Sequence, residues 1–467
     1  MDTTHEGALT YEHSLDHALE FFSKAGSLFT KSESFYDGEL SALALFQKSW
    51  ANDDELSMKL LLWLRDVRGG AGNRSGFREC LRWLGDNAAP WISVNIKWIP
   101  AVGRWDDLRS LFGTYSTLYA VKLWVNALLQ GDVLAAKWAD RKDKELRYAL
   151  GLNEAQFRKF LVKIRKEHIV EHKMCSKAWN TIEYSKVPSV AMSRYSKAFS
   201  KNDEERFVEY KLALTKGEET IHADALFPHD CVRTARSGDG AIANAQFDAL
   251  PNLLEGTDEN IVVIADTSGS MDQEIAGDIR AVDVSQALAL YCSAKIPEDN
   301  PFHKRFIGFS DEANFQSWRG MSFSDAVIDE EIFNGAVGST RIDIALNTML
   351  GFIIKYQIKQ IPTVLLIVSD MQFSQGASSE GSIEVETCLQ KWDEAGYKRP
   401  RIVYWNTAGY AGSPDTISGE NVALVSGFST GILKAVLGGE DFNPKGVMLR
   451  AVEKYNVKNP LFGNLEI

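Results

Sequence analysis

The sequence predicts a protein of two parts, an N-terminal all-α module followed by a doubly wound α/β domain. Over the first 250 residues or so, apolar residues recur at helical spacing, as at Leu56, Leu60 and Leu64, and clusters of Gly and Pro separate such stretches. From about Gly256 onward, short apolar runs of strand length alternate with amphipathic stretches of helix length. This alternation predicts a mainly parallel sheet that helices cover on both faces.

The helical module is expected to span residues 1–250. Stretches of 12 to 20 residues between the breaks indicate antiparallel helix pairs stacked as in HEAT-type arrays, although no clean repeat is present, so the array is irregular. The glycine-rich residues 69–72 are expected to form a turn between helices. The pattern loosens from Leu214, and residues 237–240 and 251–256 are expected to be linker or loop.

The α/β domain is expected to span residues 256–467. Its expected strands are 261–265, 305–309, 363–369, 401–405 and 422–425, and its expected helices are 282–294, 342–356, 383–395 and 431–437. In an open sheet of this kind, ligands bind at the carboxyl ends of the strands, near the point where the strand order reverses. The residues that follow the strands are therefore the first candidates for a binding site.

Composition indicates an ordinary soluble protein. The 467 residues are 45% hydrophobic and 24% charged, and no run of about twenty apolar residues occurs that could span a membrane. The first residues are polar and lack the basic and apolar regions of a signal peptide. The five cysteines are scattered and without a CxxC pair, as expected of buried thiols in a reducing compartment. We expect a cytoplasmic protein.

Three segments at strand ends or helix starts carry oxygen ligands. Asp266, Ser268 and Ser270 follow the first expected strand, Thr340 precedes the helix 342–356, and Asp370 follows the strand 363–369. Carboxylates and hydroxyls are hard ligands, so the set predicts Mg²⁺, with Mn²⁺ or Ca²⁺ as substitutes, and argues against zinc. Such a site stays coordinatively incomplete and can accept an acidic oxygen from a protein partner.

These residues resemble the metal-ion-dependent adhesion site of von Willebrand factor type A domains. The resemblance implies that Ser268, Ser270 and Thr340 bind the metal directly, while Asp266 and Asp370 hold its waters. Arg341 departs from the family pattern, which more often has a small or acidic residue there. With no phosphate loop and no nucleophile next to a base in the sequence, we expect a binding protein rather than an enzyme.

A basic segment interrupts an otherwise acidic chain of net charge −12. Residues 137–216 contain 19 Lys and Arg against 11 Asp and Glu. Within this segment, aromatic residues such as Trp179, Tyr184 and Phe199 follow a cluster of five cations, which are Arg158, Lys159, Lys163, Arg165 and Lys166. Cations can neutralise phosphates and exposed rings can stack on bases, which favours RNA. The alternative is that the cations are solvated and the rings are core residues.

Residues 65–74 and 103–108 resemble turns of the Ro/TROVE proteins, in which a ring of HEAT-type repeats precedes a von Willebrand A domain. Residues 174–179, 184–192 and 222–228 resemble an uncharacterised relative of those proteins found in phages, bacteria and plants. The resemblance implies an RNA-binding scaffold in a ribonucleoprotein, with small or misfolded RNAs and their single-stranded ends as ligands. The alternative is a metal-dependent adaptor or particle-assembly protein that does not bind RNA.

Overall fold

In the structure, a computed structural model, an N-terminal helical region precedes an α/β domain with a mostly parallel sheet, as the sequence predicts. The structure describes residues 2–3, 9–10, 16–28, 41–165, 169–223, 226–276, 279–333, 340–373, 381–408, 421–427, 430–437 and 442–461. Within these ranges, no helix has both the length and the apolar character that crossing a bilayer requires.

The helical region is built mainly from helices that pack on their neighbours in the chain. Side chains of Ser41, Asp53, Asn73 and Asp132 cap the first turns of four of them. The α-helices are α1 (His17–Lys24), α2 (Ala42–Asn52), α3 (Asp54–Arg65), α4 (Arg74–Asn87), α5 (Ala89–Asn95), α6 (Trp98–Val102), α7 (Thr117–Leu129), α8 (Val133–Trp138), α9 (Lys144–Ala149), α10 (Glu154–Arg165), α11 (Val170–Cys175), α12 (Ser189–Asn202), α13 (Glu204–Lys216), α14 (Pro228–Arg236) and α15 (Gly240–Asp248). A 3-10 turn, η2 (Trp105–Leu111), lies between α6 and α7.

The α/β domain contains a six-stranded sheet of order β10-β9-β8-β3-β6-β7. Its strands are β3 (Ile261–Asp266), β6 (Arg305–Phe309), β7 (Ala313–Ser317), β8 (Val364–Ser369), β9 (Arg401–Asn406) and β10 (Val422–Ser426). All neighbours are parallel except β7, which lies antiparallel to β6 at one edge. Both β3 and β8 are buried along their whole length, as expected for central strands covered on two faces.

The helices of this domain follow or flank its strands. They are α16 (Ala281–Lys295), α17 (Phe323–Ile328), α18 (Ile342–Tyr356), α20 (Ile432–Leu437) and α21 (Pro444–Val452), and α19 (Gly381–Glu394) lies beside α18. Two short strands, β4 (Glu274–Ala276) and β5 (Ile279–Arg280), form a separate hairpin between β3 and α16.

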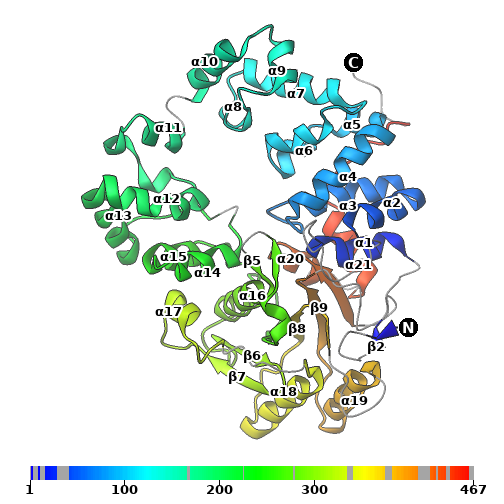
Figure 1. Ribbon diagram of the computed structural model, residues 1–467. Helices are drawn as coiled ribbons and strands as arrows, with labels where there is room; N and C mark the ends of the chain where they lie inside the picture. Colours follow the sequence, from blue (N-terminus) through cyan, green and yellow to red (C-terminus); the bar gives the residue numbers. More distant parts are fainter. Residues whose placement is uncertain are drawn as a thin grey trace.

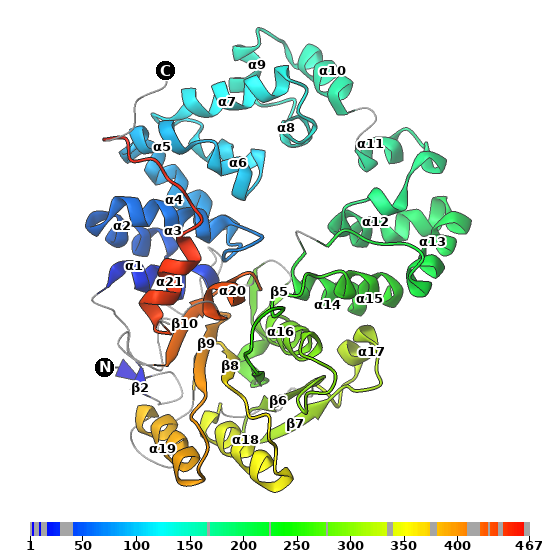
Figure 2. The same cartoon turned by 180° about the vertical axis from the view of Figure 1, so that it is seen from behind.

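The two ends of the helical region both pack against the α/β domain, so the elements form a closed circuit (Figures 1 and 2). At one end α1 contacts β10 and α21, and the backbone N–H of Gly26 donates to Ser426 Oγ at 3.0 Å. At the other end α14 contacts α16 and α17. There the Arg236 guanidinium pairs with Asp283 and donates to Gln286 Oε1 at 2.6 Å.

Two sequence-based expectations differ from the structure, that of a loop-rich stretch after Leu214 and that of five buried cysteines. The stretch after Leu214, where the pattern loosens, contains α14 and α15, and these two helices form the second contact with the α/β domain. The glycine-rich residues 69–72 lie in the turn between α3 and α4, as expected. Four cysteines are buried, but Cys175 is exposed.

Candidate metal site and basic surfaces

The residues that follow β3 and β8 meet at the carboxyl edge of the sheet. The chain runs from β3 to β6 on one side and later returns to β8 on the other side of β3, so the strand order reverses between β3 and β8. Ala265 lies opposite Val368 in the parallel register, which sets Asp266 and Asp370 at neighbouring strand ends. This is the position at which an open sheet of this type binds ligands.

Asp266 is completely buried, and both of its carboxylate oxygens accept hydrogen bonds. The backbone N–H of Ser268 donates to Oδ1 at 2.9 Å, and the Ser369 hydroxyl donates to Oδ2 at 2.6 Å. The Ser285 hydroxyl of α16 donates to the Asp266 carbonyl oxygen at 3.2 Å. The first two contacts fix the orientation of the carboxylate, and the third holds the Asp266 backbone.

The hydroxyls of the first loop lie beside this carboxylate. Ser268 Oγ and Ser270 Oγ are 3.1 Å apart, with Ser268 buried and Ser270 half-buried. The neighbouring Thr267 donates its backbone N–H to the Phe309 carbonyl oxygen at the end of β6, at 2.9 Å. The loop after β3 therefore lies against the end of β6.

Thr340 is buried just before α18, and its neighbour Arg341 donates its backbone N–H to the Ser310 carbonyl oxygen at 3.2 Å. Because Ser310 directly follows β6, this contact brings the Thr340 segment to the strand end that also contacts Thr267. The two residues before Thr340, Gly338 and Ser339, lie outside the described residues.

Asp370 is completely buried on the other side of the switch point. Its Oδ1 accepts the backbone N–H of Gln372 at 3.0 Å, and the Gln273 side-chain amide lies 3.4 Å from its Oδ2. Gln273 follows the serine loop, so this contact joins the first and third segments of the site. All three segments thus converge on one edge.

The electrostatics of this edge favour a cation. Burial and the charge of Asp370 raise the pKa of Asp266 well above the usual carboxylate range. The nearby guanidinium of Arg341 forms a bidentate pair with Asp343, at 2.8 and 2.7 Å. The Arg341 charge is thus neutralised by Asp343 in the first turn of α18. Asp266 and Asp370 are therefore the charged groups that a cation at this edge would meet.

The donor chemistry fits a hard divalent ion. Two carboxylates and three hydroxyls are oxygen ligands of the kind that Mg²⁺ takes, and charge neutralisation by a cation would relieve the burial of two like charges. No group of three or more His, Cys, Asp and Glu side chains suited to a metal ion exists within the described ranges. A site here would therefore depend on its hydroxyls.

Sequence reasoning missed three residues of this site. Ser369 directly precedes Asp370 and orients Asp266, Gln273 joins the loop to Asp370, and Ser285 holds the Asp266 backbone. The position of Ser369 at the end of a wholly apolar strand was a usable signal. Gln273 and Ser285 carry no such signal, because their roles depend on how the chain folds back onto the strand end.

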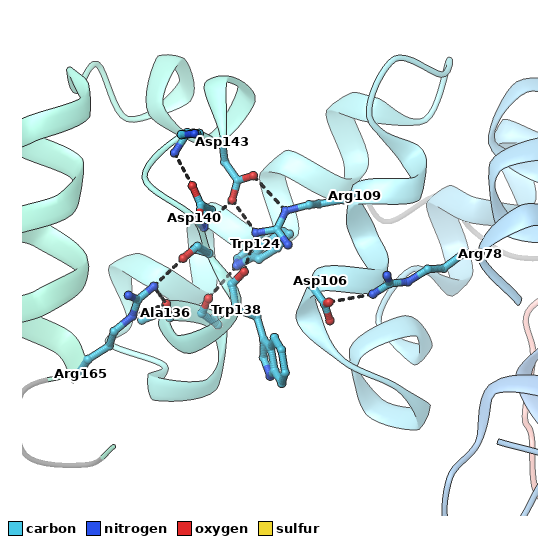
Figure 3. A network of polar contacts seen from close by, with 12 residues as sticks. Arg78, Asp106, Arg109, Trp124, Ala136, Trp138, Asp140, Asp143 and Arg165 are labelled. Atoms are coloured by element: carbon cyan, nitrogen blue, oxygen red, sulfur yellow. Dashed lines mark hydrogen bonds and ion pairs between the residues drawn. The ribbon is translucent and has the colours of Figure 1, made fainter. Parts of the chain in front are cut away.

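Of the five cations expected to contact RNA, three lie exposed on α10. They are Arg158, Lys159 and Lys163, and none forms an ion pair with a described residue. Arg165 is half-buried, and its guanidinium donates to the carbonyl oxygens of Ala136 and Ala139 at the end of α8 (Figure 3). Burial lowers the pKa of Arg165. Lys166 lies outside the described residues.

The aromatic residues of the basic segment lie in a small second core. Tyr184 and Phe199 are buried there with Phe207 and Tyr210, and the rings of Trp179 and Tyr195 are half-buried against it. Ring centroids of Tyr184 and Phe199 are 5.3 Å apart in an edge-on arrangement. The four buried rings stabilise the packing of α12 and α13 as core residues, which is the alternative that the sequence left open, and they offer no face for stacking on a base.

The chain is similar to a curated protein and to a solved structure that cover nearly its whole length. A curated relative, uncharacterized protein L728 of Acanthamoeba polyphaga mimivirus, is 26% identical over 99% of this chain and 89% of the relative. The crystal structure of the Deinococcus radiodurans RO (RSR) protein aligns with a TM-score of 0.46 and 12% identity, over 95% of this chain and 100% of that one.

Two family models match. The domain of unknown function DUF7788 matches residues 260–460, which include the α/β sheet. The domain of unknown function DUF2828 matches residues 4–112 and 86–267, which is more than half of the chain. The chain therefore belongs to the DUF2828 family.

Proposed function

We propose that the α/β domain is a von Willebrand factor type A domain that binds one divalent cation and uses it to hold an acidic group of a protein partner. The observation that carries this proposal is the pair of fully buried aspartates, Asp266 and Asp370, beside the hydroxyls of Ser268 and Ser270. Thr340 supplies the third hydroxyl. Mg²⁺ is the expected ion, and Mn²⁺ or Ca²⁺ can replace it.

In this proposal each residue has a defined task. Ser268, Ser270 and Thr340 would hold the ion directly. Asp266 and Asp370, whose oxygens already accept hydrogen bonds from the protein, would act through ordered water. The bound ion would supply positive charge at the sheet edge, where a carboxylate of a partner can complete its coordination.

The test is stabilisation by metal, measured as the shift in thermal unfolding with Mg²⁺ or Mn²⁺. An ion that binds only the folded state stabilises it by about 2.7 kcal/mol at a hundredfold excess over Kd. Ser268→Ala and Asp370→Asn should abolish the shift. Asp272→Asn is the matched control, because its carboxylate lies in the same loop but is 72% exposed and pairs with Arg280. An equal metal response in all four proteins would contradict the proposal.

We propose further that the protein is not an enzyme. A site for one cation, with three hydroxyls as direct ligands and two carboxylates acting through water, is short of the carboxylate ligands that a two-metal hydrolytic mechanism needs. Purified protein should show no Mg²⁺-dependent hydrolysis of ATP or RNA. Hydrolysis that disappears in Ser268→Ala would refute this.

As a second function, we propose that the helical region binds RNA, so that the whole chain acts as an RNA-binding scaffold of the Ro kind. The observation in favour is the exposed set Arg158, Lys159 and Lys163, without carboxylate partners among the described residues. Cations of this kind contact phosphates and do not read sequence. The competing function is a metal-dependent adaptor that binds no RNA.

A salt-dependent binding assay separates the two functions. Replacing Arg158, Lys159 and Lys163 by Glu should weaken binding of single-stranded RNA and reduce the salt slope by roughly 2, at about 0.7 per phosphate contact. The control replaces three exposed lysines of the α/β domain, Lys355, Lys359 and Lys398, by Glu. Binding that is unchanged by the first triple variant, or absent in the wild type at low salt, would favour the adaptor.

A further inference from the structure

A second group of cations lies away from α10, where the end of α3, the start of α4 and the turn η2 meet. Its four guanidiniums belong to Arg65, Arg74, Arg78 and Arg104. Arg74 and Arg78 are one turn apart on α4 and therefore share a face. Gly103, beside Arg104, lies so close to Arg65 that an added Cβ would come within 2.9 Å of Arg65 Nε.

Among the described residues, two carboxylates pair with this group, Asp107 with Arg65 and Arg78, and Asp106 with Arg78 alone. Asp107 Oδ2 accepts Arg65 Nε at 2.8 Å, and Asp107 Oδ1 accepts Arg78 Nε at 2.7 Å. Asp106 Oδ2 accepts the terminal nitrogen of Arg78 at 2.8 Å. Within the described part of the chain, the guanidiniums of Arg74 and Arg104 form neither an ion pair nor a hydrogen bond.

Arg104 is positioned by an aromatic ring instead of a carboxylate. Its guanidinium carbon lies 4.6 Å from the ring centroid of Trp138, at the end of α8, and its side chain is half-buried. Stacking fixes the plane of a guanidinium and leaves its N–H groups at the edge free to bind a planar or tetrahedral oxyanion. The Trp138 ring extends from α8 on the side of Asp106 and Arg78 (Figure 3).

The charges of this group act on one another. Burial, together with the charges of Arg74 and Arg65, lowers the pKa of Arg104 to about 10. Partial burial of the Arg74 guanidinium, together with the charges of Arg78 and Arg65, lowers the pKa of Arg74 as well. Holding like charges together costs free energy, and an anion between them would recover it.

We propose that Arg74 and Arg104 form a binding site for a phosphate group, with Arg65 and Arg78 as paired cations that strengthen the local positive field. Bidentate contacts from guanidinium suit phosphate oxygens, and Trp138 holds one of the two donors in place. Trp138 belongs to α8, and α8 lies on the inner side of the circuit of elements (Figures 1 and 2). The phosphate can be that of an RNA backbone or of a small phosphate compound.

This site goes beyond the α10 surface and does not depend on it. Loss of RNA binding in the α10 variant, with RNA binding retained in the Arg74 and Arg104 variants, would exclude RNA as the ligand of this site and keep the proposed RNA function of α10. The opposite result would keep this site and move the RNA surface away from α10.

The test uses the full-length chain with the variants Arg74→Gln and Arg104→Gln. The matched control is Arg82→Gln, which removes the same charge from an exposed position on α4, where the guanidinium donates to the Phe112 carbonyl oxygen at 3.4 Å and pairs with no carboxylate of the described residues. Because Arg104 also packs on Trp138, Arg104→Lys serves as a second variant that keeps the charge and loses the planar fork. Arg74 is exposed, so its variant should keep the wild-type melting temperature.

Two probes distinguish the sources of phosphate. A short fluorescein-labelled single-stranded RNA reports on polynucleotide by anisotropy, and inorganic pyrophosphate reports on a free phosphate by thermal shift and by competition with the RNA. We expect each Gln variant to weaken binding by about tenfold or more, with Arg104→Lys intermediate and Arg82→Gln unchanged. Pyrophosphate binding without RNA binding would assign the site to a small phosphate compound. If neither probe distinguishes Arg74→Gln and Arg104→Gln from Arg82→Gln, the proposal is wrong.

Discussion

Asp107 joins α3, α4 and η2 through hydrogen bonds to all three, and replacing it by Ala should strongly destabilise the helical region. Its side chain is fully buried and accepts from Arg65, from Arg78 and from the backbone N–H of Arg104, the last at 2.9 Å. Arg65 is itself only 2% exposed. Asp107→Ala therefore leaves a buried guanidinium without its counter-charge.

The expected magnitude follows from this burial. Removing one partner of a buried ion pair costs about 3–5 kcal/mol, because the other charge remains desolvated and unpaired. Asp106→Ala is the matched control, since Asp106 pairs only with Arg78, whose side chain is 33% exposed and retains Asp107. An ion pair of that kind contributes about 0–1 kcal/mol.

Urea unfolding of the wild type and both variants, followed by circular dichroism, measures this difference. The Asp107→Ala variant should unfold at a clearly lower urea concentration, with a loss of free energy at least about 2 kcal/mol larger than that of Asp106→Ala. Equal losses in the two variants would show that the Arg65–Asp107 pair does not stabilise this junction.

Two further predictions concern single buried groups. Burial lowers the pKa of His229 below its usual 6.5, so the unfolded chain takes up a proton that the folded chain resists. The free energy of unfolding of the wild type should therefore fall as the pH drops below about 6.5. In the His229→Gln variant, the urea midpoint should fall less than in the wild type over the same pH range. Tyr455 donates its hydroxyl to Asp66 Oδ2 at 2.7 Å and anchors the segment after α21 to the turn after α3. Tyr455→Phe should cost about 1.5–3 kcal/mol in urea unfolding and increase amide hydrogen exchange in this segment; unchanged exchange would contradict that anchoring role.

The α/β domain was largely predictable because its signals are local. The expected strand 305–309 and helix 342–356 coincide with β6 and α18, since apolar runs of strand length and the helical period are each visible within a few residues. The edge strand β7 was missed because its sequence, Ala-Asn-Phe-Gln-Ser, is mostly polar and half-exposed. The short hairpin of β4 and β5 was missed for lack of an apolar pattern.

The closure of the chain into a circuit could not be predicted from local signals. It depends on contacts such as Gly26 with Ser426, 400 residues apart, and on the approach of Gly427 to Ala71. Gly427 has φ of +110°, and an added Cβ would come within 2.9 Å of Ala71. Such requirements appear only when both surfaces are in place. For the same reason, the half-buried position of Arg165 against the end of α8 was not visible from its charge.

The most direct test of the central claim is a crystal structure of the protein grown with Mn²⁺, with anomalous diffraction recorded to locate the ion. The claim predicts one anomalous peak at the carboxyl edge of the sheet, about 2.1 Å from the hydroxyl oxygens of Ser268, Ser270 and Thr340. Asp266 and Asp370 should lie beyond it and contact it through water. A fully occupied Mn²⁺ bound elsewhere, with no peak between β3 and β8, would contradict the claim.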